Sequence, residues 1–135
     1  MAKVMTQEWC DLYKAEINKS AAYEESAKTW EGDFYFIYEA GGPVKEKAYM
    51  YVDLYHGKCR ACEMVTDPNK YKPAFTLAAT YAIWKQIATK KLDSTKALIT
   101  KQSKLTGDMA KIMRYTKAAN ELTNCTMLVP TEWLD

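Results

Sequence analysis

The sequence lacks the features of secreted, membrane-spanning and nucleic-acid-binding chains. No window approaches the ~18 uncharged apolar residues of a spanning helix, and residues 1–8 contain no apolar run before the first acid. The 19 basic and 17 acidic residues leave a net charge of only +2, whereas a nucleic-acid module usually carries a clustered basic footprint. We therefore expect a soluble cytoplasmic protein with no nucleic-acid partner and no stable membrane insertion.

Histidine is almost missing, which weakens the case for an enzyme. His56 is the only histidine, and it falls at a predicted turn with no nucleophile or oriented base identifiable beside it. A turn residue that tolerates the left-handed conformation is the simpler interpretation. A glycine-rich phosphate loop is also lacking, because Gly41-Gly42 is followed by a proline and not by a helix start.

Cysteine is present in four copies, and the absence of an export signal makes reduced thiols the expectation. The segment Cys59-Arg60-Ala61-Cys62 is the sharpest chemical candidate, because C-x-x-C spacing occurs in redox sites and in half of a zinc site. However, residues three apart on a strand point to opposite faces, and a redox pair needs its first cysteine at a helix N-terminus. We interpret Cys59 and Cys62 as structural, and expect no catalytic residue, metal or cofactor.

Aromatic side chains, by contrast, are abundant. Ten tyrosines and four tryptophans suit cavity walls or exposed sheet faces. The length of 135 residues and the 48% apolar content fit one domain, residues 1–135, that is large enough to bury a core.

Helical spacing dominates the first thirty residues. Thr6 can cap a helix whose apolar stripe includes Trp9, Leu12, Tyr13 and Ile17. The phase of the stripe slips at residues 18–20, which predicts a bend or a second helix starting at Ser20.

Aromatic and β-branched runs predict strands over residues 34–38, 48–55, 58–65 and 74–79, with the first of them central in the sheet. A two-residue turn at His56-Gly57 would pair Asp53 with Arg60 and Tyr51 with Cys62. The core face of this hairpin would then include Cys59 and Ala61. Its other face, wet or dimeric, would carry Tyr49, Tyr51 and Tyr55.

The last third alternates short helices with one short strand. Helical spacing predicts helices around residues 81–88 and 94–99, the second capped by Asp93, and residues 103–106 can form a last strand. Asp108 then opens one helix whose inner face runs from Met109 to Leu122. The predicted fold class is α+β, with a five-stranded, mainly antiparallel sheet and helices packed on one face.

Several of these segments resemble one known family. Lys104-Leu105-Thr106-Gly107-Asp108-Met109 and the helix that follows, together with the strand order upstream, are similar to the sterol carrier protein 2 (SCP2) domain family. Lys90-Lys91-Leu92 and Lys101-Gln102-Ser103 stand where that family usually has Gly-Lys-Leu. The resemblance spans about residues 30 to 122. It implies an apolar tunnel between the sheet and the C-terminal helices, and non-enzymatic binding of fatty acids, fatty acyl-CoA, sterols or phospholipids.

We therefore predict intracellular binding or transfer of an apolar, lipid-like ligand as the function. From helical periodicity alone, the apolar stripe on the last helix would be interpreted as core packing. The resemblance favours the interpretation that this stripe lines a tunnel. The predicted tunnel residues are Phe75, Leu77, Trp84, Ile87, Leu98, Met109, Ile112, Met113 and Thr116.

Two further possibilities stay open at this point. Lys111 and Arg114 on the outer side of the last helix would allow transient contact with a membrane surface, although a solvated helix face explains them as well. The alternative function is an interaction module with a collapsed cavity and no ligand, forming a homodimer through Tyr49, Tyr51 and Tyr55.

Overall fold

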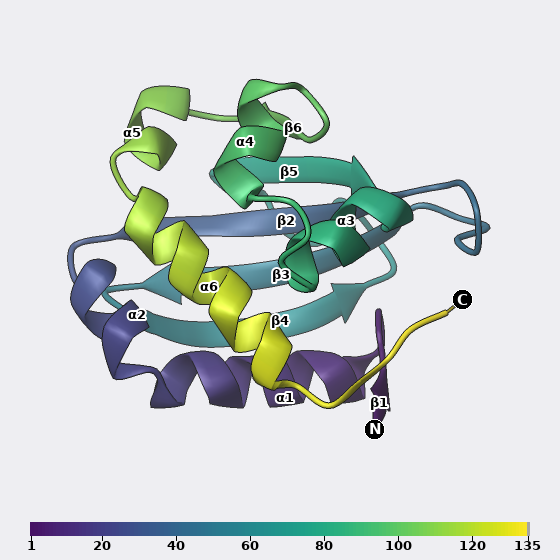
Figure 1. The fold of residues 1–135 in the computed structure, drawn as a ribbon, viewed down its shortest axis with the longest axis horizontal. Coiled ribbons are helices and arrows are strands. Elements are labelled where there is room, and N and C mark those ends of the chain that lie inside the picture. Colours follow the sequence, from purple (N-terminus) through teal and green to yellow (C-terminus); the bar gives the residue numbers. More distant parts are fainter. Residues whose placement is uncertain (135) are drawn as a thin grey trace.

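The computed structural model describes residues 1–134 and contains a five-stranded sheet with the strand order β4-β3-β2-β5-β6 (Figure 1). The strands of this sheet are β2 (Glu31–Glu39), β3 (Ala48–Tyr55), β4 (Lys58–Val65), β5 (Phe75–Thr80) and β6 (Lys104–Thr106). The α+β fold class and the central position of the 34–38 segment are confirmed. The sheet is mixed, because β5 returns to the free edge of β2 after the β3–β4 hairpin and pairs with it in parallel.

Helices cover one face of this sheet. They are α1 (Gln7–Lys19), α2 (Ala21–Ser26), α3 (Tyr81–Ala88), α4 (Ser94–Ile99), α5 (Met109–Met113) and α6 (Thr116–Leu128). Figure 1 shows α3 to α6 in front of the strands, with α1 and α2 along the β4 edge. An apolar core lies between the layers, where Tyr13, Ile17 and Val52 are buried.

The predicted helix starts are confirmed by their capping hydrogen bonds. The Thr6 hydroxyl accepts from the Trp9 N–H at 3.3 Å, and the Ser20 hydroxyl accepts from the Tyr23 N–H at 3.0 Å. The Asp93 carboxylate accepts from the N–H of Lys96 at 2.9 Å. Each cap satisfies a backbone donor that has no partner within its own helix.

The prediction of one continuous helix after Asp108 is wrong, because the chain turns at Tyr115 and separates α5 from α6. Tyr115 has φ −117° and ψ 35°, outside the helical region. Its hydroxyl shares a 2.9 Å hydrogen bond with that of Thr29, and its ring meets Trp30 edge-on at 4.9 Å. These tertiary contacts hold Tyr115 in its non-helical conformation, and the spacing of apolar residues along the sequence gives no indication of them.

The predicted register of the β3–β4 hairpin is also wrong from Asp53 onward, away from the turn. A bulge at Asp53/Leu54 leaves Arg60 without an opposite residue, so Asp53 pairs with Ala61 and Val52 with Cys62. Because the bulge shifts the alternation by one residue, Cys59 and Cys62 both face the core and Ala61 turns to the opposite face. Arg60 still reaches the Asp53 carboxylate, with its Nε 3.1 Å from Oδ2.

The other face of the sheet is partly covered by the chain itself. Tyr71 stacks on Tyr51 with ring centroids 3.7 Å apart, and Tyr51 is only 7% exposed. The Tyr35 hydroxyl donates to the backbone carbonyls of Pro68 and Tyr71. The expected tyrosine face is therefore not open as a whole, since of its three members only Tyr55 is exposed.

A second, two-stranded sheet joins the two ends of the chain. The strands β1 (Ala2–Lys3) and β7 (Thr131–Glu132) pair in parallel, and the Trp9 indole donates to the Thr131 hydroxyl at 2.9 Å. Sequence patterns did not predict this pairing, because two residues are too few for any periodicity.

Candidate functional site

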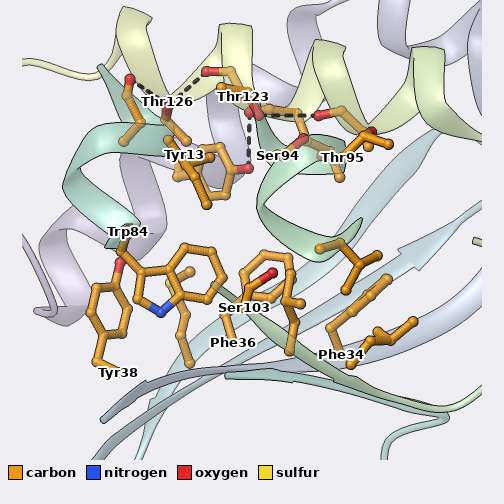
Figure 2. Close-up of a pocket in the computed structure, with 18 of the residues that line it drawn as sticks. Tyr13, Phe34, Phe36, Tyr38, Trp84, Ser94, Thr95, Ser103, Thr123 and Thr126 are labelled. Carbon is orange, nitrogen blue, oxygen red and sulfur yellow. Dashed lines mark hydrogen bonds between the residues drawn. The ribbon is translucent and has the colours of Figure 1, made fainter. Parts of the chain in front are cut away.

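An apolar cavity of about 140 Å³ lies between the sheet and the helices. Its walls come from nearly every element of the main fold: β2, β3, β5 and β6 on the sheet side, and α1, α3, α4, α5 and α6 on the helix side. In Figure 2 the rings of Phe34, Phe36 and Trp84 lie toward the strands, and the labelled Thr123, Thr126 and Ser94 lie toward the helices.

Seven of the nine predicted tunnel residues line this cavity. They are Leu77, Trp84, Ile87, Leu98, Ile112, Met113 and Thr116. The structure places Phe75 outside it, because its ring is buried between Trp30 and Phe34 at centroid distances of 5.4 and 5.1 Å. Met109, at the start of α5, also lies outside the cavity; it is 44% exposed and lines an adjoining surface hollow.

Aromatic residues from the first half of the chain complete the cavity. The residues missed from the sequence include Trp9, Tyr13, Phe34, Phe36 and Tyr38. A signal for the last three was available, because alternate residues of a central strand share a face and Phe34, Phe36 and Tyr38 follow that spacing. No comparable signal tells which side of α1 faces a cavity and which side faces solid core.

The cavity's polar groups are mostly satisfied by the protein itself. The Tyr13 hydroxyl donates to the Leu122 carbonyl at 3.0 Å, and the Trp84 indole donates to the Ile37 carbonyl at 2.8 Å. The Thr126 hydroxyl lies 2.6 Å from the Thr123 carbonyl. These side chains turn their polar ends to the backbone and present carbon to the interior.

Ser94 differs from them. Among residues 1–134, its hydroxyl is the buried side-chain polar atom that has no hydrogen-bond partner, and Ser94 lines the cavity. A buried hydroxyl without a partner costs about 1–3 kcal/mol, so this oxygen is a ready acceptor or donor for a polar group on a ligand.

The buried tyrosine and cysteine side chains of the core are poorly suited to catalysis. Burial raises the pKa of the Tyr13 hydroxyl well above its ordinary value. Burial also raises the pKa of the Cys59 thiol to about 12, and a hydrogen bond with Cys10 together with burial raises the pKa of Cys62. Thiols held protonated are weak nucleophiles and weak metal ligands. Both cysteines face the same side, contrary to the sequence argument, but their protonation still disfavours redox chemistry.

The described part of the chain offers neither a metal cluster nor a spanning helix. Residues 1–134 contain no group of three or more histidine, cysteine, aspartate or glutamate side chains placed to hold a metal ion. None of the helices described has the length and apolar character needed to cross a bilayer.

Comparison with known proteins agrees with this geometry. The family model of the SCP-2 sterol transfer family matches residues 12–120, whereas no curated protein matches the chain. Two solved structures superpose on almost all of it. A crystal structure of sterol carrier protein 2 has 27% identity, a TM-score of 0.87, and coverage of 94% of this chain and 99% of that one.

The second structure is a conserved hypothetical protein of Thermus thermophilus, described as a candidate sterol carrier protein. It has 26% identity and a TM-score of 0.87, and covers 98% of this chain and 93% of that one. The apo form of sterol carrier protein 2 from Yarrowia lipolytica shares the fold at 16% identity and a TM-score of 0.59, over 87% and 88% of the two chains. Because the family model spans most of its length, this chain belongs to the SCP-2 sterol transfer family.

Proposed function

We propose that this protein binds one lipid-like molecule with a long alkyl chain in the cavity between the sheet and helices α3 to α6, and carries it without transforming it. Family membership supports lipid binding in general. The observation that carries the finer proposal is the cavity itself, whose wall is mostly apolar and aromatic, with a few serine and threonine side chains on the helix side. Each methylene transferred into it gains about 0.8 kcal/mol, so affinity needs few polar contacts.

The size of the cavity restricts how such a ligand fits. A cavity of about 140 Å³ is close to the ~150 Å³ engineered cavity that holds benzene, so it accommodates only part of a long chain. A surface hollow continues outward from it and shares the side chains of Leu98, Ser103, Leu105 and Met113. The ligand's chain therefore extends past these shared side chains into the hollow, and the flexible Met113 side chain moves aside to admit it.

The alternative, a dimerisation module built on the tyrosine face, has less support. Tyr51 is covered by Tyr71, whose hydroxyl donates to Glu63 at 2.9 Å, so a partner would have to displace an ordered segment of the same chain. An open apolar face of the size that a stable dimer needs is not offered by Tyr55 alone.

A charge placed in the cavity wall tests the proposal. We expect native mass spectrometry of the purified protein to show bound fatty acid, and a fluorescent fatty-acid analogue to bind in titration. Met113→Glu should lower the affinity for the analogue by at least about tenfold, because a carboxylate in an apolar wall opposes burial of the chain.

Met127→Glu is the matched control, because Met127 is 54% exposed and lines neither the cavity nor the hollow. Its affinity should equal that of the unmodified protein, and both variants should elute as the same oligomer. A protein that carries no lipid and also ignores the fluorescent analogue would overturn the proposed function.

A further inference from the structure

The surface hollow beside the cavity is lined by residues of α4, β6 and α5 and of the loop between α4 and β6. These elements lie along one edge of the molecule in Figure 1. Its lining shares Leu98, Leu105 and Met113 with the cavity. These side chains are thus a partition between the interior and the outside. A ligand that moves between the hollow and the cavity crosses this partition.

Apolar side chains stand exposed on the rim of this hollow. Ile99 at the end of α4 is 65% exposed, and Met109 at the start of α5 is 44% exposed. Met127 and Leu128 are also exposed, but neither lines the hollow or the cavity. Large apolar groups beside a cavity entrance mark a surface that is covered at some stage.

Positive charge is concentrated in the same segment. Residues 90–114 contain seven basic and two acidic residues, although the whole chain has a net charge of only +2. Both acids, Asp93 and Asp108, cap helices. Lys101 and Lys104 line the hollow, and the ion pairs found among residues 1–134 all lie outside residues 90–114.

Lys111 differs from Lys101 and Lys104, because its ammonium group contacts other parts of the protein. Its Nζ donates to the Glu31 carbonyl at 2.6 Å and lies 4.9 Å from the Trp30 ring centroid. These contacts tie Lys111 to the fold, and the lysines that line the hollow are Lys101 and Lys104.

The backbone at Lys101 is strained in a way that a glycine would relieve. Lys101 has φ +63° directly after α4, where the Gln102 N–H donates to the Ala97 carbonyl at 2.8 Å and closes the helix end. Lys90 has φ +62° in the corresponding position after α3. A side chain in this left-handed conformation destabilises the fold relative to glycine, so a glycine at either position removes a lysine charge without a cost in stability.

We infer that the α4–β6–α5 edge docks on an anionic lipid bilayer, with Ile99 and Met109 entering the interfacial layer and Lys101 and Lys104 against the headgroups. This inference rests on the proposed function, since it gives a lipid a dry path from the bilayer to the cavity. A bilayer is the occupant that matches apolar tips, cationic neighbours and an adjoining lipid-sized opening together.

Vesicle binding of Lys101→Gly tests the docking surface. The unmodified protein should sediment with phosphatidylcholine vesicles that contain phosphatidylserine, and much less with pure phosphatidylcholine vesicles or at high salt. Lys101→Gly should bind anionic vesicles about fivefold more weakly, the effect of one lysine near such a surface. Its melting temperature should be equal or higher, which separates lost docking from unfolding.

Lys90→Gly is the matched control, because it removes the same charge and relieves the same strain but lies outside the lining of the hollow. Equal losses in the two variants, or equal binding to charged and neutral vesicles, would overturn the inference. Absent vesicle binding with intact uptake of the fluorescent analogue overturns docking and leaves the proposed function standing. Ile99→Ser should weaken binding to anionic vesicles without changing its dependence on salt.

Discussion

The hydroxyl of Ser94 is the single-residue feature that most clearly separates this cavity from ordinary core. Ser94 and Thr126 both line the cavity, but the Thr126 hydroxyl bonds the Thr123 carbonyl at 2.6 Å and the Ala88 carbonyl at 3.3 Å, whereas that of Ser94 has no partner among residues 1–134. Folding therefore strips the Ser94 hydroxyl of solvent without compensation. Such a cost is tolerated where it serves binding.

Removing the two hydroxyls should have opposite effects. Ser94→Ala should raise the free energy of unfolding by about 0.5–1 kcal/mol, because it deletes an unsatisfied polar atom, and Thr126→Val should lower it by about 1 kcal/mol. Urea unfolding measures both. If Ser94 serves a polar group on the ligand, Ser94→Ala should also bind a hydroxylated fatty acid more weakly and a plain one equally well. Destabilisation by Ser94→Ala would contradict this account.

At the scale of elements, the step from β6 to α5 depends on a glycine. Gly107 has φ +131°, and a Cβ placed on it would lie 2.5 Å from Cδ1 of Phe75 and 3.0 Å from the Ala74 carbonyl oxygen. Phe75 is itself fixed by Trp30 and Phe34. Position 107 must therefore carry no side chain if β6 and α5 are to pack closely against β5. The same packing positions the side chains between the cavity and the hollow.

Gly107→Ala should destabilise the protein by at least about 3 kcal/mol, as the sum of a backbone cost of about 1–3 kcal/mol and a steric cost of about 1–3 kcal/mol. Gly41→Ala supplies the control, since Gly41 has a similar φ of +147° but no atom within 4 Å of the added Cβ. The stability of Gly41→Ala should fall only by the backbone cost, without the steric cost. Thermal or urea unfolding of both variants isolates the collision with Phe75, and equal losses would argue against it.

On the scale of the whole molecule, the cavity has two different ends. The hollow that we propose as the entrance lies at the α4–β6–α5 edge. The two termini lie at another edge, where β1 and β7 pair (Figure 1). Trp133 follows β7, lines the cavity and meets Tyr81 edge-on at 6.1 Å. The joined termini therefore close the end of the cavity that lies away from the charged edge.

Opening the closed end should speed up ligand loss. Trp133→Ala removes a large half-buried ring and should cost about 2 kcal/mol of stability, less than the ~3–5 kcal/mol of a fully buried tryptophan. Stopped-flow measurement of fatty-acid release should then show faster dissociation than in Glu132→Ala, which changes an exposed neighbour. Unchanged release from Trp133→Ala would contradict the closing role of this ring.

Much of the architecture follows from local chemistry in the sequence. Thr6, Ser20 and Asp93 begin helices because their side chains cap backbone donors wherever a helix follows, and the aromatic run at 34–38 forms a strand because such side chains fit a pleated, buried surface. The amphipathic spacing in α3 to α6 also placed most of the predicted tunnel residues at the cavity. These features depend on neighbours a few positions away, so they can be read from the chain alone.

Only the tertiary structure decided the features that depend on distant contacts. The bulge at Arg60 turned Cys62 inward, the contacts of Tyr115 with Thr29 and Trp30 divided the last helix, and the pairing of the termini closed one end of the cavity. The cavity itself belongs to this group. An apolar stripe has the same sequence pattern whether it packs against solid core or lines a cavity. Whether a cavity forms depends on the volume left between several elements, and the sequence of one element does not determine that volume.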